Sequence, residues 1–415
     1  MMPDPEGKQQ KQVVVHGGIC ALGPQARVQA SIQITDGYIT GILSEPPLSP
    51  NDRSSCTAID LSGFLIMPGL INAHDHLEFA LFPRLADPPY RNYIEWGTDI
   101  HNKFPDIIAK HRAVPKDLRV WWGGIRNLLC GVTTVSHHNP LRAEMQREDF
   151  PVRVIQEYGW GHSLALGGDL IAARSATPEG RAFLVHACEG VDEVARVELL
   201  GFDRLGLLDD HTVLVHGLAI DHDGVALMRE RNASLIVCPS SNNFLFEKLP
   251  DMSVLGAIDN VALGNDSPLT AEGDLLDEIR FAIRLCGISS LDAYRMVTEN
   301  PALILRLENG EGAIRVSGIA DLIAFRDTGC DAAHRLQALS MVDVEFVMLG
   351  GRVQLASEAV LERLPLSEKH GLEPVWIDGT IRWLRTPVKE LLQKTEEALG
   401  KGELRLSGKQ IRIPA

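Results

Sequence analysis

The chain has 415 residues, of which 45% are hydrophobic and 23% charged, and its formal net charge at pH 7 is −15. This composition is typical of a globular protein with material for a large core, and the acidic balance argues against nucleic-acid binding. The seven scattered cysteines form no Cys-x-x-Cys pair, and the chain has neither an 18-residue apolar run nor an apolar leader. We therefore expect a cytoplasmic protein with free thiols, no membrane partner and a small-molecule substrate. A homodimer is compatible with this sequence.

Short β-strands are predicted near both ends of the chain. The N-terminal part has β-rich runs at 13–15, 30–34 and 38–42, and Asp36-Gly37 is a hairpin signal between the last two. Similar runs at 321–325 and 344–349 return near the C-terminus. We expect a small composite β-sandwich domain built from residues 1–65 and 312–360. Residues 361–415 predict a helical appendage, because apolar positions from 388 onward follow a helical spacing.

Residues 66–311 predict the central domain. Apolar, strand-like runs alternate there with helical patterns such as 191–200, 224–231 and 275–285. Repeated strand–helix units indicate a parallel α/β core, and their spacing favours a closed barrel over an open sheet. The Gly-x-Gly-x-x-Gly turn of dinucleotide-binding folds is missing from the sequence, which argues against that class.

The ends of the predicted strands hold side chains that can bind a metal ion. The apolar run 64–73 ends in His74-Asp75-His76, and strand alternation puts both imidazoles on one face while Asp75 points away, with little expected effect on ligation. Later apolar runs end in His186, His216 and Asp266. Because the carboxyl ends of barrel strands meet at one mouth, these groups can form a zinc or iron site. Taken singly, each histidine could be a core residue, and Asp266 could be a helix cap.

These motifs, in this order, resemble the metal-dependent amidohydrolase superfamily, especially its cytosine/guanine deaminase and triazine-hydrolase-like branch. The resemblance spans roughly residues 12–355. It rests on 67–76, His186-Ala187-Cys188-Glu189, Leu214-Val215-His216-Gly217, Cys238-Pro239-Ser240-Ser241-Asn242, Leu263-Gly264-Asn265-Asp266-Ser267 with 274–278, 299–302 and 318–322.

The resemblance implies a distorted (β/α)8 barrel, that is, a TIM barrel, with a composite β-sandwich. It assigns His74, His76, His186 and Asp266 to one divalent metal ion, zinc first and iron second. It also implies that Glu189 shuttles protons, that His216 orients the attacking water, and that Asp266 accepts the proton from that water.

Some residues depart from the motifs of this superfamily, and the roles of others remain open. No lysine lies between Lys116 and Lys248, so the carboxylated lysine of binuclear members is missing and one metal ion is favoured. Glu157 could supply a ligand to a second metal; otherwise Gln156 or Glu157 is a candidate for substrate contact. His138 and Trp96 are further substrate-pocket candidates, although each could instead have a structural role.

The leading hypothesis is a hydrolase that releases ammonia or an amine from a planar N-heterocycle, and its main support is the position of Glu189 three residues after His186. An amidase or cyclic-amide hydrolase on the same barrel is the alternative. A non-catalytic scaffold is a third reading, which the complete ligand set argues against.

Overall fold

Parallel strands form the centre of the computed structural model, which describes residues 11–44, 56–166 and 168–414. Three strands pair in one group and five in a second. The first group is β7 (Leu70–Asp75), β8 (Val132–His137) and β9 (Arg153–Val154). The second is β10 (Gly159–Gly161), β11 (Phe183–Ala187), β12 (Thr212–His216), β13 (Ser234–Val237) and β14 (Val261–Leu263).

The two groups meet where β14 approaches β7. The amide of Asp266 donates a hydrogen bond to the carbonyl of His74 at 3.0 Å, just beyond β14. Between β9 and β10 the described chain has only residues 155–158 and no helix, so the barrel is distorted there. This is the distorted (β/α)8 barrel that the sequence predicts. Every residue of β11 and β12 is buried, as expected for parallel strands covered on both faces.

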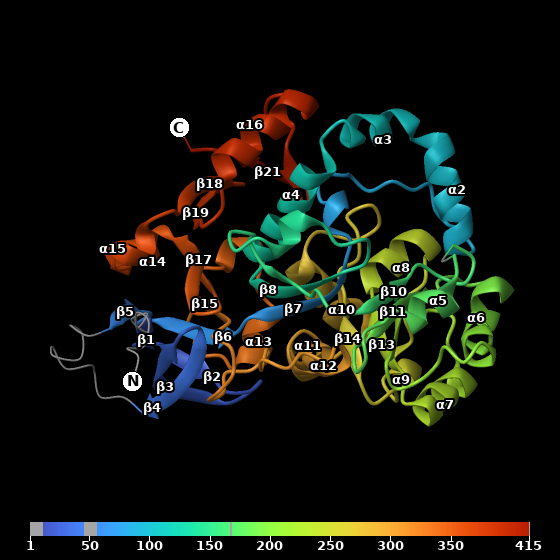
Figure 1. Ribbon diagram of the computed structural model, residues 1–415, viewed down its shortest axis with the longest axis horizontal. Helices are drawn as coiled ribbons and strands as arrows, with labels where there is room; N and C mark the ends of the chain where they lie inside the picture. The colour runs from blue at the N-terminus through green and yellow to red at the C-terminus, as the bar shows by residue number, and fades with distance from the viewer. Residues whose placement is uncertain (1–10, 45–55, 167, 415) are drawn as a thin grey trace, which may run out of the picture.

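Helices lie between the strands of the second group and after it (Figure 1). Aspartates cap several of them: Asp192, Asp221 and Asp274 accept backbone hydrogen bonds at the first turns of α6, α7 and α10. The helices in chain order are α5 (Leu170–Ser175), α6 (Glu193–Arg204), α7 (His222–Arg231), α8 (Pro239–Phe246), α9 (Met252–Leu255), α10 (Leu275–Cys286), α11 (Ser290–Met296) and α12 (Glu299–Ile304). Among the described residues, no helix is long and apolar enough to cross a membrane.

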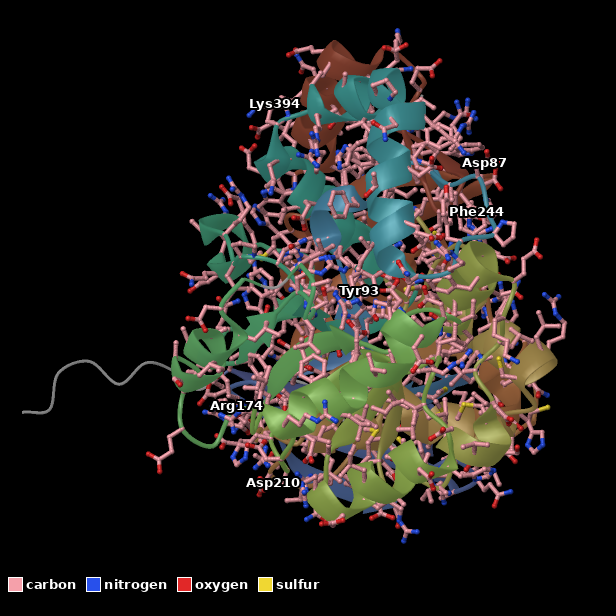
Figure 2. All side chains as sticks on the ribbon, turned by 90° about the vertical axis from the view of Figure 1, so that its right-hand side faces the viewer. Asp87, Tyr93, Arg174, Asp210, Phe244 and Lys394 are labelled. Atoms are coloured by element: carbon pink, nitrogen blue, oxygen red, sulfur yellow. The ribbon has the colours of Figure 1, made fainter. Side chains whose placement is uncertain are left out.

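The connection from β7 to β8 is long and forms a wall outside the barrel. It contains η1 (Leu77–Phe79), α2 (Tyr93–Lys103), α3 (Pro105–Arg112) and α4 (Lys116–Leu129). Figure 2 shows the labelled Tyr93 where α2 meets the green barrel segments. α4 packs so closely on η1 that only glycine fits at position 123. A Cβ atom there would lie 2.4 Å from the carbonyl oxygen of Leu77. A short η2 (Ala143–Gln146) follows β8.

Both ends of the chain join one hydrogen-bonded sheet, at the left of Figure 1. β6 pairs antiparallel with β15 along five residue pairs, which brings the two ends together. The N-terminal strands are β1 (Gln12–His16), β2 (Ile19–Ala21), β3 (Arg27–Thr35), β4 (Tyr38–Ser44), β5 (Thr57–Asp60) and β6 (Phe64–Pro68), and the C-terminal ones begin with β15 (Leu322–Arg326), β16 (Phe346–Leu349) and β17 (Arg352–Ser357). Short helices α13 (Ala332–Leu336) and η3 (Met341–Asp343) lie between β15 and β16.

The C-terminal segment differs from the predicted helical appendage. Four of its strands extend the same sheet, so the segment is mixed rather than helical. Its elements are α14 (Glu358–Arg363), α15 (Leu366–Lys369), β18 (Glu373–Ile377), β19 (Thr380–Leu384), α16 (Val388–Leu399), β20 (Arg405–Leu406) and β21 (Lys409–Arg412). The helix expected from residue 388 is α16. We propose that residues 11–44, 56–68 and 312–414 form one β domain, since β6 continues to Pro68 and the last strands pair within the same sheet.

Candidate metal centre

The carboxyl ends of four barrel strands bring a cluster of imidazoles and one carboxylate together. His74 lies in β7 and His76 follows it, His186 lies in β11, and His216 ends β12, while Asp266 comes three residues after β14. Asp266 and His216 have backbone φ angles of +58° and +77°. Such angles strain residues other than glycine, and they persist where the surrounding structure enforces them, often at functional sites.

The donor atoms of this cluster have the separations that a tetrahedral metal site needs. The Nε2 atoms of His74 and His186 are 3.2 Å apart. Oδ1 of Asp266 lies 3.6 Å from Nε2 of His74 and 3.6 Å from Nε2 of His76. Ligand atoms about 2.1 Å from a zinc ion in a tetrahedron lie about 3.4 Å from one another. His74, His76 and Asp266 therefore form one set of donors that could hold a divalent metal ion, and His74, His186 and His216 form a second set that shares His74.

The protonation states also suit metal binding. Burial lowers the pKa of His76 and His186 well below the usual value, and it lowers the pKa of His216 to about 4. These imidazoles are therefore neutral at pH 7 and keep a lone pair for a metal ion. Burial opposes the ionisation of Asp266, but the contact with His74 and the nearby His216 hold its pKa well below the usual value.

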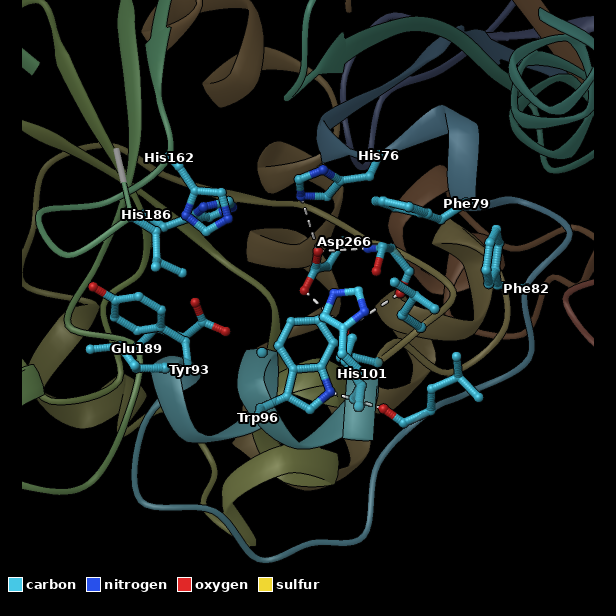
Figure 3. Close-up of a pocket in the computed structure, with 18 of the residues that line it drawn as sticks. His76, Phe79, Phe82, Tyr93, Trp96, His101, His162, His186, Glu189 and Asp266 are labelled. Carbon is cyan, nitrogen blue, oxygen red and sulfur yellow. Dashed lines mark hydrogen bonds and ion pairs between the residues drawn. The ribbon is translucent and has the colours of Figure 1, made fainter. Parts of the chain in front are cut away.

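Glu189 lies beside His216 at the edge of this cluster. Its Oε2 is 3.6 Å from Nε2 of His216, and Figure 3 shows its carboxylate turned into the pocket. Burial raises the pKa of Glu189 well above its usual value, and the negative charges of Asp266 and Glu198 act in the same direction. A carboxyl group with a raised pKa holds its proton more readily, as a general acid must. This behaviour suits a proton carrier.

The first turn of α8 fixes two members of the cluster. Oγ of Ser241 donates to Oδ2 of Asp266 at 2.7 Å, and Asn242 Oδ1 lies 3.0 Å from Nδ1 of His216. The helix start is itself anchored by the preceding Ser240, whose amide donates to Oε1 of the buried Glu278 at 2.8 Å. The hydrogen bond at one imidazole nitrogen sets the tautomer and the orientation of the ring. Ser241 and Asn242 are thus positioning residues for Asp266 and His216.

We predict that Asn242→Ala lowers kcat by about 10–100-fold, because partners of this kind are worth that much in activity. His216 would keep its place in β12 but lose its partner at Nδ1. The matched control is Asn243→Ala, one residue further along the same helix and outside the cavity lining. Steady-state kinetics of the two variants test this; equal losses in both would mean that helix disruption, rather than ring orientation, causes the effect.

A buried ion pair lies behind His74 and His76. The side chain of Asp75 points away from the cluster, as predicted, and Nη2 of Arg126 donates to its Oδ1 at 2.7 Å. Nδ2 of Asn127 donates to Oδ2 of Asp75 at 2.7 Å. The same Arg126 nitrogen lies 3.3 Å from the carbonyl oxygen of Asp266. Through Arg126, Asp75 therefore connects the strand of His74 to the loop of Asp266, which is a reason to test the predicted small effect of Asp75 on ligation.

A cavity of about 470 Å³ opens next to the cluster. Its lining includes His76, His186, His216, Glu189 and Asp266, and α2 and α3 form its outer wall. The predicted pocket residue Trp96 lines this wall, where its Nε1 donates to the carbonyl of Leu85 at 2.9 Å (Figure 3).

His162 also lines the cavity, and the sequence reasoning missed it. It directly follows β10, whose sequence Gly-Trp-Gly has little strand character. Its position just beyond a mid-barrel strand was the available signal. Its ring lies 4.9 Å from the ring of His186, centroid to centroid.

Three predicted pocket residues do not line the cavity. His138 is fully buried, its ring stacks on His186 at 4.2 Å between centroids, and its Nε2 lies 2.9 Å from the carbonyl of Gly161, so it supports a ligand from behind. Gln156 is exposed and its Nε2 donates to the carbonyl of Val154. Glu157 is exposed and pairs with Arg181 at 2.7 Å. Because β9 ends before them, both side chains lie outside the barrel mouth, which removes the case for a second metal at Glu157.

Comparisons of the sequence with known proteins point to one family. Residues 161–353 match the model of the Amidohydrolase family. The chain is 25% identical over 417 residues to the 5-methylthioadenosine/S-adenosylhomocysteine deaminase of Syntrophobacter fumaroxidans, covering 84% of this chain and 94% of the relative. The protein of the same name from Pyrococcus furiosus is 25% identical over 378 residues, covering 75% and 85%.

Solved structures share the fold. An adenosine deaminase from Xanthomonas campestris with bound zinc has a TM-score of 0.67 and 19% identity, covering 94% of this chain and 98% of the other. Atrazine chlorohydrolase from Arthrobacter aurescens, in complex with zinc and atraton, has a TM-score of 0.70 and 16% identity, covering 93% and 100%. Residues 161–353 therefore match the Amidohydrolase family and the chain shares the fold of these proteins, which confirms the resemblance seen in its sequence.

Proposed function

We propose that the protein is a metal-dependent hydrolase of carbon–nitrogen bonds that deaminates a planar N-heterocycle. The observation that carries this proposal is Glu189, a buried carboxyl group with a raised pKa that faces the cavity beside His216. Deamination needs a proton at a ring nitrogen, and a group of this kind can deliver it. The names of the relatives, which are deaminases, support the same class.

The proposed metal ligands are His74, His76, His186 and Asp266, and the proposed metal is zinc, because nitrogen-rich tetrahedral sites suit it. When bound, the metal would lower the pKa of a coordinated water molecule towards about 7.

The side chains of this chain would carry the proton transfers. Asp266 is fixed by the hydroxyl of Ser241 at 2.7 Å and by the amide of Ser267 at 2.6 Å, so it can take the proton of the attacking water without moving. Glu189 would protonate the ring nitrogen, which makes the adjacent carbon electrophilic. A carbon–oxygen bond forms, the carbon–nitrogen bond breaks, and the amine leaves with a proton from Asp266 or Glu189. His216 would stabilise the charge that develops at the attacked carbon.

The test is ammonia release by the purified, zinc-loaded protein from a panel of purines, pyrimidines, pterins and triazines. We expect turnover of at least one ring system, its loss after chelation, and its return on adding zinc. Turnover of N-acyl compounds, together with no ammonia release from any compound of the panel, would favour an amidase instead. Tightly bound metal below about half an equivalent, not restored by zinc or iron, would favour the scaffold alternative.

A further inference from the structure

We propose that the heterocycle bears an apolar substituent rather than a sugar. This inference rests on the proposed function, since it concerns the substrate of the same site. Away from the metal cluster, the cavity is walled by apolar side chains from η1, α2, α3 and the loop after β14. They are Phe79, Phe82, Trp96, Ile100, Ile108 and Leu269. Figure 3 shows Phe79 and Phe82 on the side of the pocket opposite Glu189 and Tyr93.

The polar atoms of this wall are already engaged with the protein. The hydroxyl of Tyr93 donates to Oε1 of Glu198 at 2.7 Å and accepts the amide of Ala165 at 3.3 Å. The indole nitrogen of Trp96 donates to a backbone carbonyl. The hydroxyl of Thr98 donates to the carbonyl of Ile94 at 3.0 Å. The hydrogen-bond donors of Tyr93, Trp96 and Thr98 are therefore all used within the protein.

The charged groups of the lining fall into two sets. Among the described residues that line the cavity, the carboxylates are Glu189 and Asp266, both at the metal cluster. His101 and Arg112 are exposed at the outer end of the wall. Arg112 can donate hydrogen bonds to sugar hydroxyls, but only at this outer end of the wall. A ribosyl group placed against Phe79, Phe82, Ile100 and Leu269 would have its hydroxyls facing apolar side chains.

The expected discrimination follows from these contacts. Each buried hydroxyl without a partner weakens binding by about tenfold, and each buried methylene group strengthens it by about fourfold. A ring with a butyl group should therefore be a better substrate than the same ring with a ribosyl group by at least about tenfold in kcat/KM.

The experiment compares three compounds on each ring: unsubstituted, N-butyl and N-ribosyl forms of adenine and of cytosine, with ammonia release by the zinc-loaded protein as the readout. A butyl form that exceeds its ribosyl counterpart tenfold or more supports the inference. A ribosyl form that equals or exceeds the butyl form overturns it and leaves the proposed function standing. If no ammonia is released from any ring, including those of the wider heterocycle panel, the proposed function is overturned and this inference with it. Calorimetry with metal-free protein is a second readout, in which the butyl form should again bind more tightly.

A matched pair of variants on α3 locates the substituent. Ile108 lines the cavity, whereas the preceding Ile107 is 37% exposed and does not. We expect Ile108→Ala to reduce the preference for the butyl over the unsubstituted ring by about five- to tenfold, Ile108→Val to reduce it less, and Ile107→Ala to leave it unchanged. An unchanged preference in both Ile108 variants would overturn the placement of the substituent on this wall.

Discussion

Replacing Glu189 with glutamine should abolish turnover while leaving the metal content unchanged. The amide has the shape of the carboxyl group but cannot pick up and release a proton, and loss of a positioned acid–base group costs about 10²–10⁴-fold in rate. Glu189 is not among the proposed ligands: its side chain lies against Nε2 of His216 at 3.6 Å, at the edge of the cluster. We therefore expect kcat to fall by about 10³-fold, with one equivalent of zinc retained by elemental analysis.

The control is Glu193→Gln, the same change on the exposed first turn of α6, four residues further along the chain. It should keep full activity. If Glu189→Gln lost its metal, the carboxylate would have to be reassigned as a ligand. If it kept wild-type turnover, Asp266 alone would have to move the protons.

The sequence predicted the barrel well, and it placed the candidate ligands at the ends of its strands, because both depend on local patterns. Apolar runs such as those of β11 and β12 are long enough to identify as buried strands, and each ends in a histidine. Once strands and their order are known, the convergence of their carboxyl ends follows from the topology of the fold. The arrangement of His74, His186 and Asp266 thus needed no knowledge of distant contacts.

The predictions that differ from the structure concern residues whose positions depend on tertiary contacts. Gln156 and Glu157 seemed to end a barrel strand, but β9 contains only Arg153 and Val154, so the strand ends before them. His138 follows β8 as expected, yet it packs behind His186 rather than facing the cavity. A local sequence pattern determines neither where a short strand ends nor which of two neighbouring histidines faces the cavity.

The C-terminal segment illustrates a missed local signal. Asp378-Gly379 joins β18 and β19 as a two-residue hairpin turn, a pattern as strong as the Asp36-Gly37 turn near the N-terminus. Since these strands complete a sheet that begins at the other end of the chain, their partners could not be identified from the segment itself.

The second large effect should come from Asp75, the residue between His74 and His76. Asp75 and Arg126 are both almost fully buried, with side chains 0% and 1% exposed. Removing one member of a buried ion pair leaves an uncompensated charge, which costs about 3–5 kcal/mol. We therefore expect Asp75→Asn to lower the free energy of unfolding of the metal-free protein by about that amount, measured by urea denaturation.

The exposed pair Arg147–Asp149 is a suitable comparison, because it has a similar distance of 2.8 Å but side chains 58% and 43% exposed. Asp149→Asn should cost no more than about 1 kcal/mol. The double variant Asp75→Asn/Arg126→Gln should recover part of the loss, since no unpaired charge remains. Additive losses in the double variant would instead show that the two side chains act independently.

The same substitution tests whether the ion pair positions the metal ligands. Arg126 contacts both the carboxylate of Asp75 and the carbonyl of Asp266, so it holds β7 and the loop after β14 in register. Loss of a supporting contact of this kind weakens metal binding by about 10–100-fold. Zinc titration of Asp75→Asn should therefore show a higher Kd than the wild type, whereas Asp149→Asn should bind zinc as the wild type does. An unchanged Kd in a destabilised Asp75→Asn would mean that the pair holds the fold together without shaping the site.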